Sequence, residues 1–273
     1  MPIIKDPEPA LDPPAALVLE STYGDRHHQQ SDPERRFREV IQRVFQRGGT
    51  VIIPAFALGR TQEVLYHLSE LANDGELDPD VVFLDSPMAI KATDLYDQAT
   101  AEHDEDLLEL VEQHLDPLAP DRFQRCLSSE QSKALNKRTE PAVIVAASGM
   151  ATGGRVVHHL KHRLADARNA VVFVGYQAGG TRGRALVDGA ETVSIHGQPV
   201  PVEAEILSLH GLSAHADQAE LVRWFGDLPA VPGQVFLNHG EDQSRKALAA
   251  VLGSGDASRP RPQLPANGDA FRW

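Results

Sequence analysis

Polar side chains follow seven short apolar segments of the sequence, at the points where predicted strands end. They occur in Glu20-Ser21-Thr22, Gly59-Arg60, Asp85-Ser86, Ser148-Gly149, Gly175-Tyr176, Ser213-Ala214-His215-Ala216-Asp217 and Asn238-His239-Gly240-Glu241. In open α/β sheets, ligands bind beyond the carboxyl ends of the strands. Taken together, these groups favour a binding or catalytic site over a set of ordinary turns.

Two histidines, His215 and His239, lie among these strand ends. Either one alone is more often a hydrogen-bonded structural residue, but the two together favour a shared role in proton transfer or metal binding. His158 and His162 also have the four-residue spacing of a metal clip on a helix. No third ligand accompanies that pair, so a solvated helix face is the better interpretation.

The segment from Ser148 to Arg155 links a predicted strand to a helix and contains Gly153 and Gly154. Small residues let backbone amides approach an anion, and Arg155 could bind a phosphate with its guanidinium fork. An ordinary flexible turn explains the same residues equally well. For Arg60, at the start of another predicted helix, phosphate binding and an ordinary structural role are likewise equally good interpretations. No Lys-Ser/Thr pair closes the segment as in a P-loop, and no Gly-x-Ser-x-Gly elbow occurs around Ser148 or Ser213.

Short apolar runs alternate with segments of helical period over the first two thirds of the chain. The predicted strands cover residues 17–19, 51–57, 81–84, 142–147 and 171–174. Such alternation indicates a mostly parallel sheet with helices on both faces. After Gly180 the period changes, and residues 192–195 and 200–209 are expected to form antiparallel strands. The tail from Gly253, rich in Gly, Pro and Ser, is expected to be a loose end.

The composition excludes several classes of protein. With 273 residues, 41% hydrophobic and 24% charged, the chain is neither disordered nor fibrous. A net charge of −13 excludes binding of nucleic acid by bulk charge, although a local basic groove remains open. The single cysteine, Cys126, excludes an intrachain disulfide and a Cys-rich zinc cluster. Without a secretion signal or an apolar run of about 20 residues, a cytoplasmic protein is expected.

Six segments, in this order, resemble the β-CASP branch of the metallo-β-lactamase superfamily, whose members are RNA-processing zinc nucleases. They are Leu19-Glu20-Ser21-Thr22-Tyr23-Gly24-Asp25-Arg26, Pro54-Ala55-Phe56-Ala57-Leu58-Gly59-Arg60-Thr61-Gln62-Glu63, Asp85-Ser86-Pro87-Met88-Ala89, Ser148-Gly149-Met150 with Gly153-Gly154-Arg155, Ser213-Ala214-His215-Ala216-Asp217 and Asn238-His239-Gly240-Glu241. The resemblance extends over residues 2–252.

The resemblance implies a partial metallo-β-lactamase αββα fold, formed by residues 1–24 and 206–273, with an inserted Rossmann-like β-CASP domain over residues 25–205. It also implies the roles of individual residues. His239 would ligate zinc, and His215, held by Glu20, would protonate the leaving oxygen. The RNA phosphates would face Ser213 and the loops that contain Arg60, Ser148, Gly153, Gly154 and Arg155.

One family feature is missing, because His-x-His-x-Asp-His, the main zinc motif, does not occur in this sequence. The family holds two zinc ions, and cleavage with two metals needs ions about 3.5–4 Å apart. We therefore expect an N-terminally truncated chain that lacks most metal ligands and is not a competent nuclease alone. The uncovered surface would favour a homodimer or pairing with another chain.

Three hypotheses follow. The first is a zinc-dependent RNA nuclease in which zinc activates the attacking water and His215 is the general acid. The second is a non-catalytic RNA-binding or scaffold subunit of an RNA-processing complex. A weaker third is a nucleotide-binding Rossmann protein, but no Gly-x-Gly-x-x-Gly follows the first strand.

Overall fold

Contacts divide the chain into two compact units. The computed structural model describes residues 3–5, 12–28, 33–113, 117–118, 122–209, 212–255 and 258–272. Unit 1 comprises residues 1–6 and 31–214, and unit 2 comprises residues 7–30 and 215–273. Unit 2 is therefore assembled from two segments that are far apart in the sequence.

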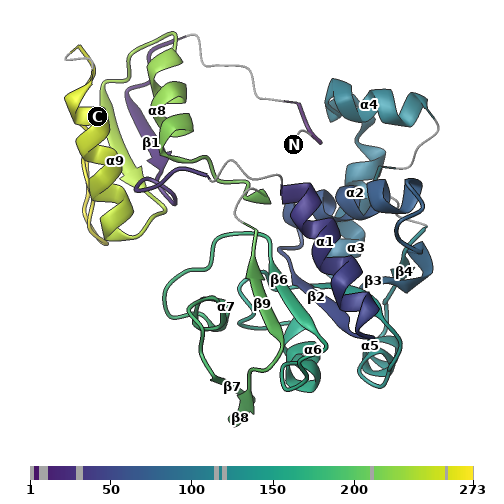
Figure 1. The fold of residues 1–273 in the computed structure, drawn as a ribbon. Helices are drawn as coiled ribbons and strands as arrows, with labels where there is room; N and C mark the ends of the chain where they lie inside the picture. Colours follow the sequence, from purple (N-terminus) through teal and green to yellow (C-terminus); the bar gives the residue numbers. More distant parts are fainter. Residues whose placement is uncertain are drawn as a thin grey trace. The chain divides into compact units, whose positions relative to one another are not determined.

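A six-stranded parallel sheet forms the centre of unit 1 (Figure 1). The strand order is β4-β3-β5-β2-β6-β9, and each pair of neighbours is parallel. The strands are β2 (Thr50–Pro54), β3 (Val82–Leu84), β4 (Gln124–Arg125), β5 (Ala142–Ala146), β6 (Ala170–Phe173) and β9 (Glu205–Ser208). The α/β fold with a parallel sheet that the sequence predicts is confirmed.

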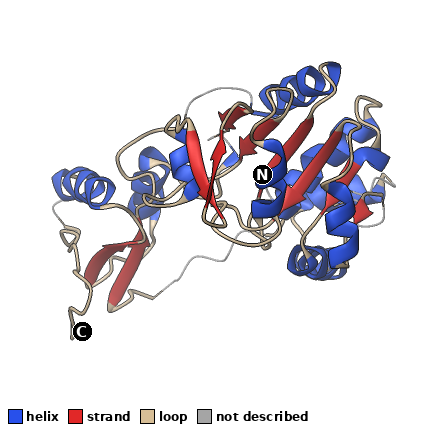
Figure 2. Ribbon diagram, turned by 90° about the horizontal axis from the view of Figure 1, so that it is seen from below, coloured by secondary structure: helices blue, strands red, loops and turns tan. Residues whose placement is uncertain are grey.

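Helices cover both faces of this sheet (Figure 2). Unit 1 contains the α-helices α1 (Pro33–Gln46), α2 (Arg60–Asn73), α3 (Pro87–Gln98), α4 (Glu105–Glu112), α5 (Ser129–Leu135), α6 (Val156–Arg163) and α7 (Arg182–Val187), and the 3-10 helices η1 (Pro79–Val81) and η2 (Thr100–Glu102). Val51 and Ile53 of β2 pack in the core with α1 and α2, whereas Ile52 packs in the core with α6. Because successive strand residues face opposite sides, both faces must be apolar, which explains the continuous apolar strands.

The antiparallel arrangement predicted for residues 192–209 is only partly correct. Strands β7 (Thr192–Ile195) and β8 (Gln198–Pro201) form an antiparallel hairpin. The segment does not continue as one strand, because β9 begins at Glu205 and pairs in parallel with β6. Prolines lack the N–H that extends a ladder, and Pro199 and Pro201 confine β8 to the short hairpin. By this pairing β9 belongs to unit 1; the predicted domain boundary at residue 206 stays a prediction.

Unit 2 contains a short parallel sheet and two helices. Strands β1 (Ala16–Glu20) and β10 (Gln234–Asn238) pair in parallel, with Glu20 opposite Asn238. Helices α8 (Gln218–Asp227) and α9 (Asp242–Ser254) supply the other half of its apolar core. Parallel pairing places the carboxyl ends of both strands together. Across the described residues of both units, every helix is too short or too polar to cross a membrane.

The C-terminal tail packs on unit 2, so the expectation of a loose end beyond Gly253 is wrong. Helix α9 continues to Ser254, and Gln263 then forms a parallel bridge with β10. Its amide donates to the carbonyl of Val235 at 2.8 Å, and its carbonyl accepts from the amide of Leu237 at 3.0 Å. These main-chain bonds cover one edge of β10, and main-chain pairing does not depend on the Gly, Pro and Ser composition that predicts a loose end.

Arg259 anchors this tail to the end of α8. Its guanidinium donates to the carbonyls of Phe225 at 2.8 Å, Gly226 at 2.7 Å and Leu228 at 3.3 Å. These carbonyls lie at the C-terminal end of α8, where a helix has no further amides of its own to pair with them. We expect Arg259→Ala to lower the free energy of unfolding by about 1–3 kcal/mol, because charged hydrogen bonds are lost. Denaturant unfolding measures this, and exposed Arg261→Ala is the control; equal stability of the two variants would contradict the anchor.

Candidate active site

Glu20, His215 and His239 converge in unit 2. Glu20 is the last residue of β1, and His239 directly follows β10. The parallel register brings these two strand ends together, and His215 approaches from the segment before α8. One potential ligand atom from each of the three side chains lies within 4.8 Å of the other two. The structure therefore brings together the predicted acid, its carboxylate partner and the predicted zinc ligand.

The imidazole of His215 lies against the Glu20 carboxylate. Its Nδ1 is 3.2 Å from Oε1 of Glu20, and its ring centroid is 5.1 Å from that of His239. The side chains of His215 and Glu20 are 35% and 27% exposed, so solvent or a ligand can reach them. A carboxylate that accepts from Nδ1 fixes the orientation of the ring and leaves Nε2 for proton transfer.

Glu20 is held in its ionised form. Burial raises the pKa of this carboxyl, but hydrogen bonds from His215 and Thr22 outweigh burial and lower it to about 2. Near neutral pH the side chain is therefore an acceptor of hydrogen bonds. It can orient an imidazole or ligate a cation.

Thr22 links all three residues, and the sequence did not single it out. Its amide donates to Oε2 of Glu20 at 2.9 Å, and its hydroxyl donates to the carbonyl of His239 at 2.9 Å. The same hydroxyl lies 3.4 Å from Nδ1 of His215 and 3.2 Å from Nδ1 of His239. The available signal was a threonine two residues after a carboxylate at a strand end, a common local hydrogen-bonding pattern.

The segment that carries His215 is fixed by the start of α8. Asp217 caps the helix and forms a reciprocal capping box with Glu220. Asp217 also accepts from the amide of His28 at 2.9 Å, and the ring of His28 contacts the carbonyl of His215 at 2.9 Å. The buried ring of Tyr23 meets His215 edge-on, with centroids 6.4 Å apart. His215 is thus positioned by His28, which contacts its carbonyl, and by Tyr23, which contacts its ring.

A close backbone approach positions His239. His239 has a φ of 53°, an uncommon conformation outside glycine. The next residue, Gly240, lies so near β1 that an added Cβ would be 2.5 Å from the carbonyl oxygen of Ser21. Ser21 in turn donates its hydroxyl to the carbonyl of Asn238 at 2.8 Å. Only glycine lets the chain turn against β1 at this point.

The donor set of these side chains fits a zinc ion. Zinc takes imidazole nitrogens and carboxylate oxygens, and two histidines with one glutamate form a known ligand set. Glu20, His215 and His239 supply these donors. Among the residues that the structure describes, no second group of three such side chains comes together.

The two arginines predicted to contact RNA phosphates have internal partners in unit 1. Arg60 is only 6% exposed and donates to Glu63 and to the carbonyl of Leu212. Arg155 donates from Nη1 to Oδ1 of the buried Asp85 at 2.7 Å, and its side chain is 20% exposed. A phosphate contact by Arg60 would require the guanidinium to leave its partners. Arg155 can be reached without such a movement.

The other predicted phosphate contacts also lie in unit 1. Ser148 approaches Thr152 within its loop, with 3.4 Å between the hydroxyl oxygens. Gly153 has open space around its Cα, whereas a Cβ on Gly154 would lie 2.3 Å from the carbonyl oxygen of Ala147. Ser213 is half-buried. The loop therefore offers small residues with accessible backbone at Gly153, and its contact with RNA stays a prediction.

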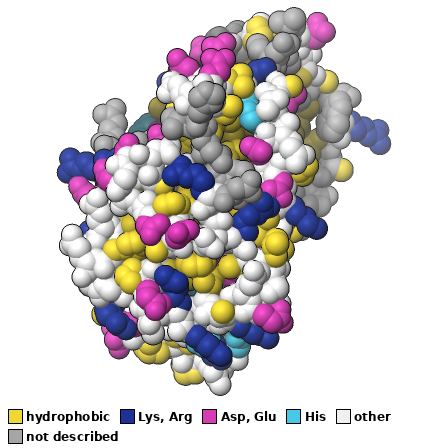
Figure 3. Space-filling view, turned by 90° about the vertical axis from the view of Figure 1, so that its right-hand side faces the viewer, with side chains coloured by type: hydrophobic (Ala, Val, Ile, Leu, Met, Phe, Trp, Pro, Cys, Tyr) yellow, Lys and Arg dark blue, Asp and Glu magenta, His cyan; other side chains and the backbone are white. Residues whose placement is uncertain are grey.

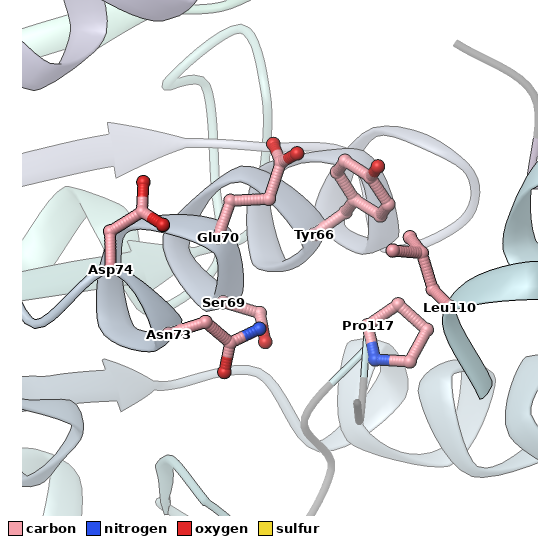
Figure 4. A pocket seen from close by; sticks show the side chains of 7 residues that line it. All are labelled: Tyr66, Ser69, Glu70, Asn73, Asp74, Leu110 and Pro117. Atoms are coloured by element: carbon pink, nitrogen blue, oxygen red, sulfur yellow. The ribbon is translucent and has the colours of Figure 1, made fainter. Parts of the chain in front are cut away.

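A pocket of about 170 Å³ in unit 1 contains none of the predicted residues. Leu110 and Pro117 lie across from side chains of α2 (Figure 4). The α2 side chains that line it are Tyr66, Ser69, Glu70, Asn73 and Asp74. Its two carboxylates would repel a phosphate, so the pocket does not suit an RNA backbone.

Comparison with known proteins identifies two domains. The Beta-Casp domain matches residues 61–186, and the Zn-dependent metallo-hydrolase RNA specificity domain matches residues 199–256. Ribonuclease TTHA0252 of Thermus thermophilus is 41% identical over 248 residues, which is 90% of this chain and 56% of that protein.

Two archaeal proteins are also similar. Transcription termination factor FttA of Pyrococcus abyssi is 34% identical over 86% of this chain and 38% of its own length. The RNase J-like protein of Methanocaldococcus jannaschii is 33% identical over 86% of this chain and 54% of its own length. The chain thus spans about half, or less, of the length of these curated relatives.

Proposed function

Because this chain belongs to the β-CASP branch of the metallo-β-lactamase superfamily, we propose that it contributes the proton-donating part of a zinc-dependent ribonuclease. The main support is the 3.2 Å contact between His215 and Glu20, next to His239. The names of the relatives, a ribonuclease and an RNase J-like protein, agree with this class of substrate and reaction. The substrate is an RNA phosphodiester bond.

Each of the converging residues has a distinct role. Zinc bound by His239 would activate a water molecule and stabilise negative charge on the phosphate. Glu20 accepts from Nδ1 of His215, so the opposite ring atom, Nε2, is the one that delivers a proton to the leaving oxygen. Thr22 holds the Glu20 carboxylate with its amide and the His239 carbonyl with its hydroxyl.

Contact with RNA would come from local groups rather than from bulk charge. The net charge is −13, and Figure 3 shows Lys and Arg side chains interspersed with Asp and Glu on the face that it draws. The loop from Ser148 to Arg155, the helix start at Arg60 and the segment at Ser213 are the proposed contacts. Arg155 is the one for which partial exposure and positive charge coincide.

We further propose that this chain alone does not cleave RNA. With His215 as the acid and Glu20 as its partner, His239 is the one converging residue of the described chain left to ligate zinc. A catalytic zinc generally takes three protein ligands, and hydrolysis with two metals needs ligands for both ions. The test compares this chain with the product of the complete coding sequence, using zinc analysis and cleavage of a labelled single-stranded RNA. We expect the complete product to hold two zinc ions and cleave, and this chain to hold fewer and not cleave.

The outcomes separate the alternatives. Retention of two zinc ions and cleavage by this chain alone would disprove the incomplete site. If the complete product binds RNA but does not cleave it, the ribonuclease proposal fails and an RNA-binding scaffold subunit explains the protein better.

A further inference from the structure

The sheet of unit 1 exposes large apolar side chains at its carboxyl edge, on both sides of the loop from Ser148 to Arg155. That loop follows β5, whose neighbours in the sheet are β3 and β2. Met88, after β3, is 68% exposed, whereas Phe56 and Leu58, after β2, are 44% and 65% exposed. One exposed apolar residue is ordinary, but several that gather at one edge indicate a binding surface.

Phe56 is the aromatic residue among these side chains, and its main chain is fixed. Its carbonyl accepts from the amide of Thr61 at 3.1 Å and from the hydroxyl of Thr61 at 2.7 Å. The preceding residue, Ala55, donates its amide to the carbonyl of Ala146 on β5 at 3.1 Å. Because the ring is presented by an ordered segment, little conformational entropy is lost when a ligand packs on it.

The ring of Phe56 rests against the loop itself, at Gly149. A Cβ on Gly149 would lie 2.7 Å from Cδ2 and 2.8 Å from Cε2 of the ring, so glycine is needed for this approach. The ring is thus supported by the loop and still partly open to solvent. A supported, partly exposed aromatic ring is a surface on which another flat ring can stack.

The groups suited to a phosphate lie next to this ring. Ser148, which precedes Gly149, donates its amide to the carbonyl of Gly153 at 3.2 Å. Gly153 has open space around its Cα, and the side chain of Arg155 is 20% exposed. An aromatic surface beside a phosphate-sized opening with accessible backbone matches a nucleotide of a single strand, in which base and phosphate are neighbours.

The positive charge of Arg155 is offset by two carboxylates. Burial raises the pKa of Asp85, but hydrogen bonds, the first of them from His159, outweigh burial and hold it below its usual value. Asp85 is therefore ionised, and its Oδ1 accepts from Nη1 of Arg155 at 2.7 Å. Glu130 of α5 interacts electrostatically with both Arg155 and Lys133.

Two other arginines at this edge also have internal partners. Arg60 pairs with Glu63, and Arg182 donates to the carbonyl of Ala151 within the loop. Cations and carboxylates are thus interspersed here, and the net charge of the chain is −13. Affinity for RNA at this edge therefore needs a contact that does not depend on charge, and stacking of a base is such a contact.

We propose that Phe56 is a base-stacking residue: one nucleobase of a single strand stacks on its exposed ring, and the adjoining phosphate lies at the loop from Ser148 to Arg155. The ligand is an unpaired strand, because the bases of a duplex already stack on one another. Its assignment as RNA rests on the proposed function. Stacking tolerates any base, since every base has a π-face.

Equilibrium binding of a labelled, unstructured RNA oligonucleotide tests the stacking, with EDTA present to keep the RNA intact. We expect Phe56→Leu, which remains apolar but has no π-face, to bind about fivefold or more weakly, as loss of one stacked base implies. Phe56→Trp should bind at least as tightly as the parent chain. Equal affinities of Phe56→Leu and the parent chain would overturn the proposal.

The matched control is Trp224→Leu, because Trp224 is an aromatic residue of α8 that is 50% exposed and lies outside the proposed surface. This variant should bind RNA like the parent chain. A loss equal to that of Phe56→Leu would mean that removal of any exposed aromatic ring weakens binding, and would overturn the specific role of Phe56.

An abasic oligonucleotide separates stacking from a change in the shape of the loop. It carries the same phosphates but no bases, so at low salt Phe56→Leu and the parent chain should bind it equally. A loss as large as that with normal RNA would overturn the proposal. Phe56→Leu should also keep the parent slope of log affinity against log salt, because it removes no phosphate contact. A smaller slope would contradict stacking.

The same variants separate this inference from the proposed function. If the complete product binds RNA through Phe56 but does not cleave it, the ribonuclease proposal fails and the stacking role stands. If the complete product cleaves RNA, and Phe56→Leu binds and cleaves like the parent, the stacking role fails and the ribonuclease proposal stands. A complete product that does not bind RNA would overturn both.

Discussion

His215→Ala, made in the product of the complete coding sequence, should lower the rate of RNA cleavage by about 10²–10⁴-fold, the usual contribution of a positioned general acid. The reason is geometric. Nδ1 of His215 is occupied by Glu20 at 3.2 Å, so Nε2 is the atom left to protonate the leaving oxygen. Alanine leaves Glu20 and His239 in place. Single-turnover cleavage of a labelled RNA measures the rate, and zinc analysis is done on the same samples.

The control for this variant is His158→Ala, because His158 is an exposed histidine on α6 outside the candidate site. It should cleave at the parent rate. A parent-like rate for His215→Ala would disprove the acid role. A slow variant that has also lost zinc would mean that His215 is a metal ligand, which the donor set of the three residues also allows.

The second large effect concerns stability. Asp85→Asn should lower the free energy of unfolding by about 3–5 kcal/mol, the usual result of removing one partner of a buried ion pair. The substitution keeps the shape of the side chain but leaves Arg155 without its counter-charge and the buried His159 without its carboxylate partner. Denaturant unfolding, with the slope compared between variants, measures the loss.

Asp94→Asn is the matched control, because Asp94 also pairs with an arginine, Arg125, but is 37% exposed. An exposed pair contributes only about 0–1 kcal/mol. If Asp85→Asn and Asp94→Asn lose the same stability, burial of the Asp85 contacts does not cause the loss, and the negative charge assigned to Asp85 is wrong.

The effect of Asp85→Asn should also depend on pH. The pKa of Asp85 is lowered in the folded state. A lowered carboxyl pKa contributes stability above the unfolded value of about 3.9, and that stability is lost as pH falls through the folded value. The difference between parent and variant should therefore be full near neutral pH and shrink below about pH 4. A difference that is constant over this range would contradict the linkage.

The parallel strands, and the residues at their carboxyl ends, could be predicted from the sequence. Short apolar runs that alternate with helical segments indicate a parallel sheet, and parallel strands have their carboxyl ends at one edge. Glu20 and His239 each stand at such an end, so their proximity follows once β1 and β10 are neighbours. The specific role of His215 as the proton donor depended on the family resemblance.

Tertiary hydrogen bonds could not be predicted in the same way. Arg155 was expected to be available for phosphate, but its partner Asp85 lies 70 positions earlier, and no spacing rule relates them. The Thr22 hydroxyl approaches His215 and His239 across 193 and 217 positions, and no spacing rule predicts these contacts either. The tail at Gln263 was misjudged because Gly, Pro and Ser suggest disorder, whereas main-chain pairing with β10 does not require an apolar pattern.

The division of unit 2 into two distant segments has a consequence for biosynthesis. Glu20 leaves the ribosome long before His215, and at typical rates of about 5–20 residues per second it waits about 10–40 s for that partner. Nearly all of unit 1 is synthesised during this interval. The reactive cluster therefore closes late on the nascent polypeptide, and ribosome profiling combined with arrest at chosen lengths could time its closure.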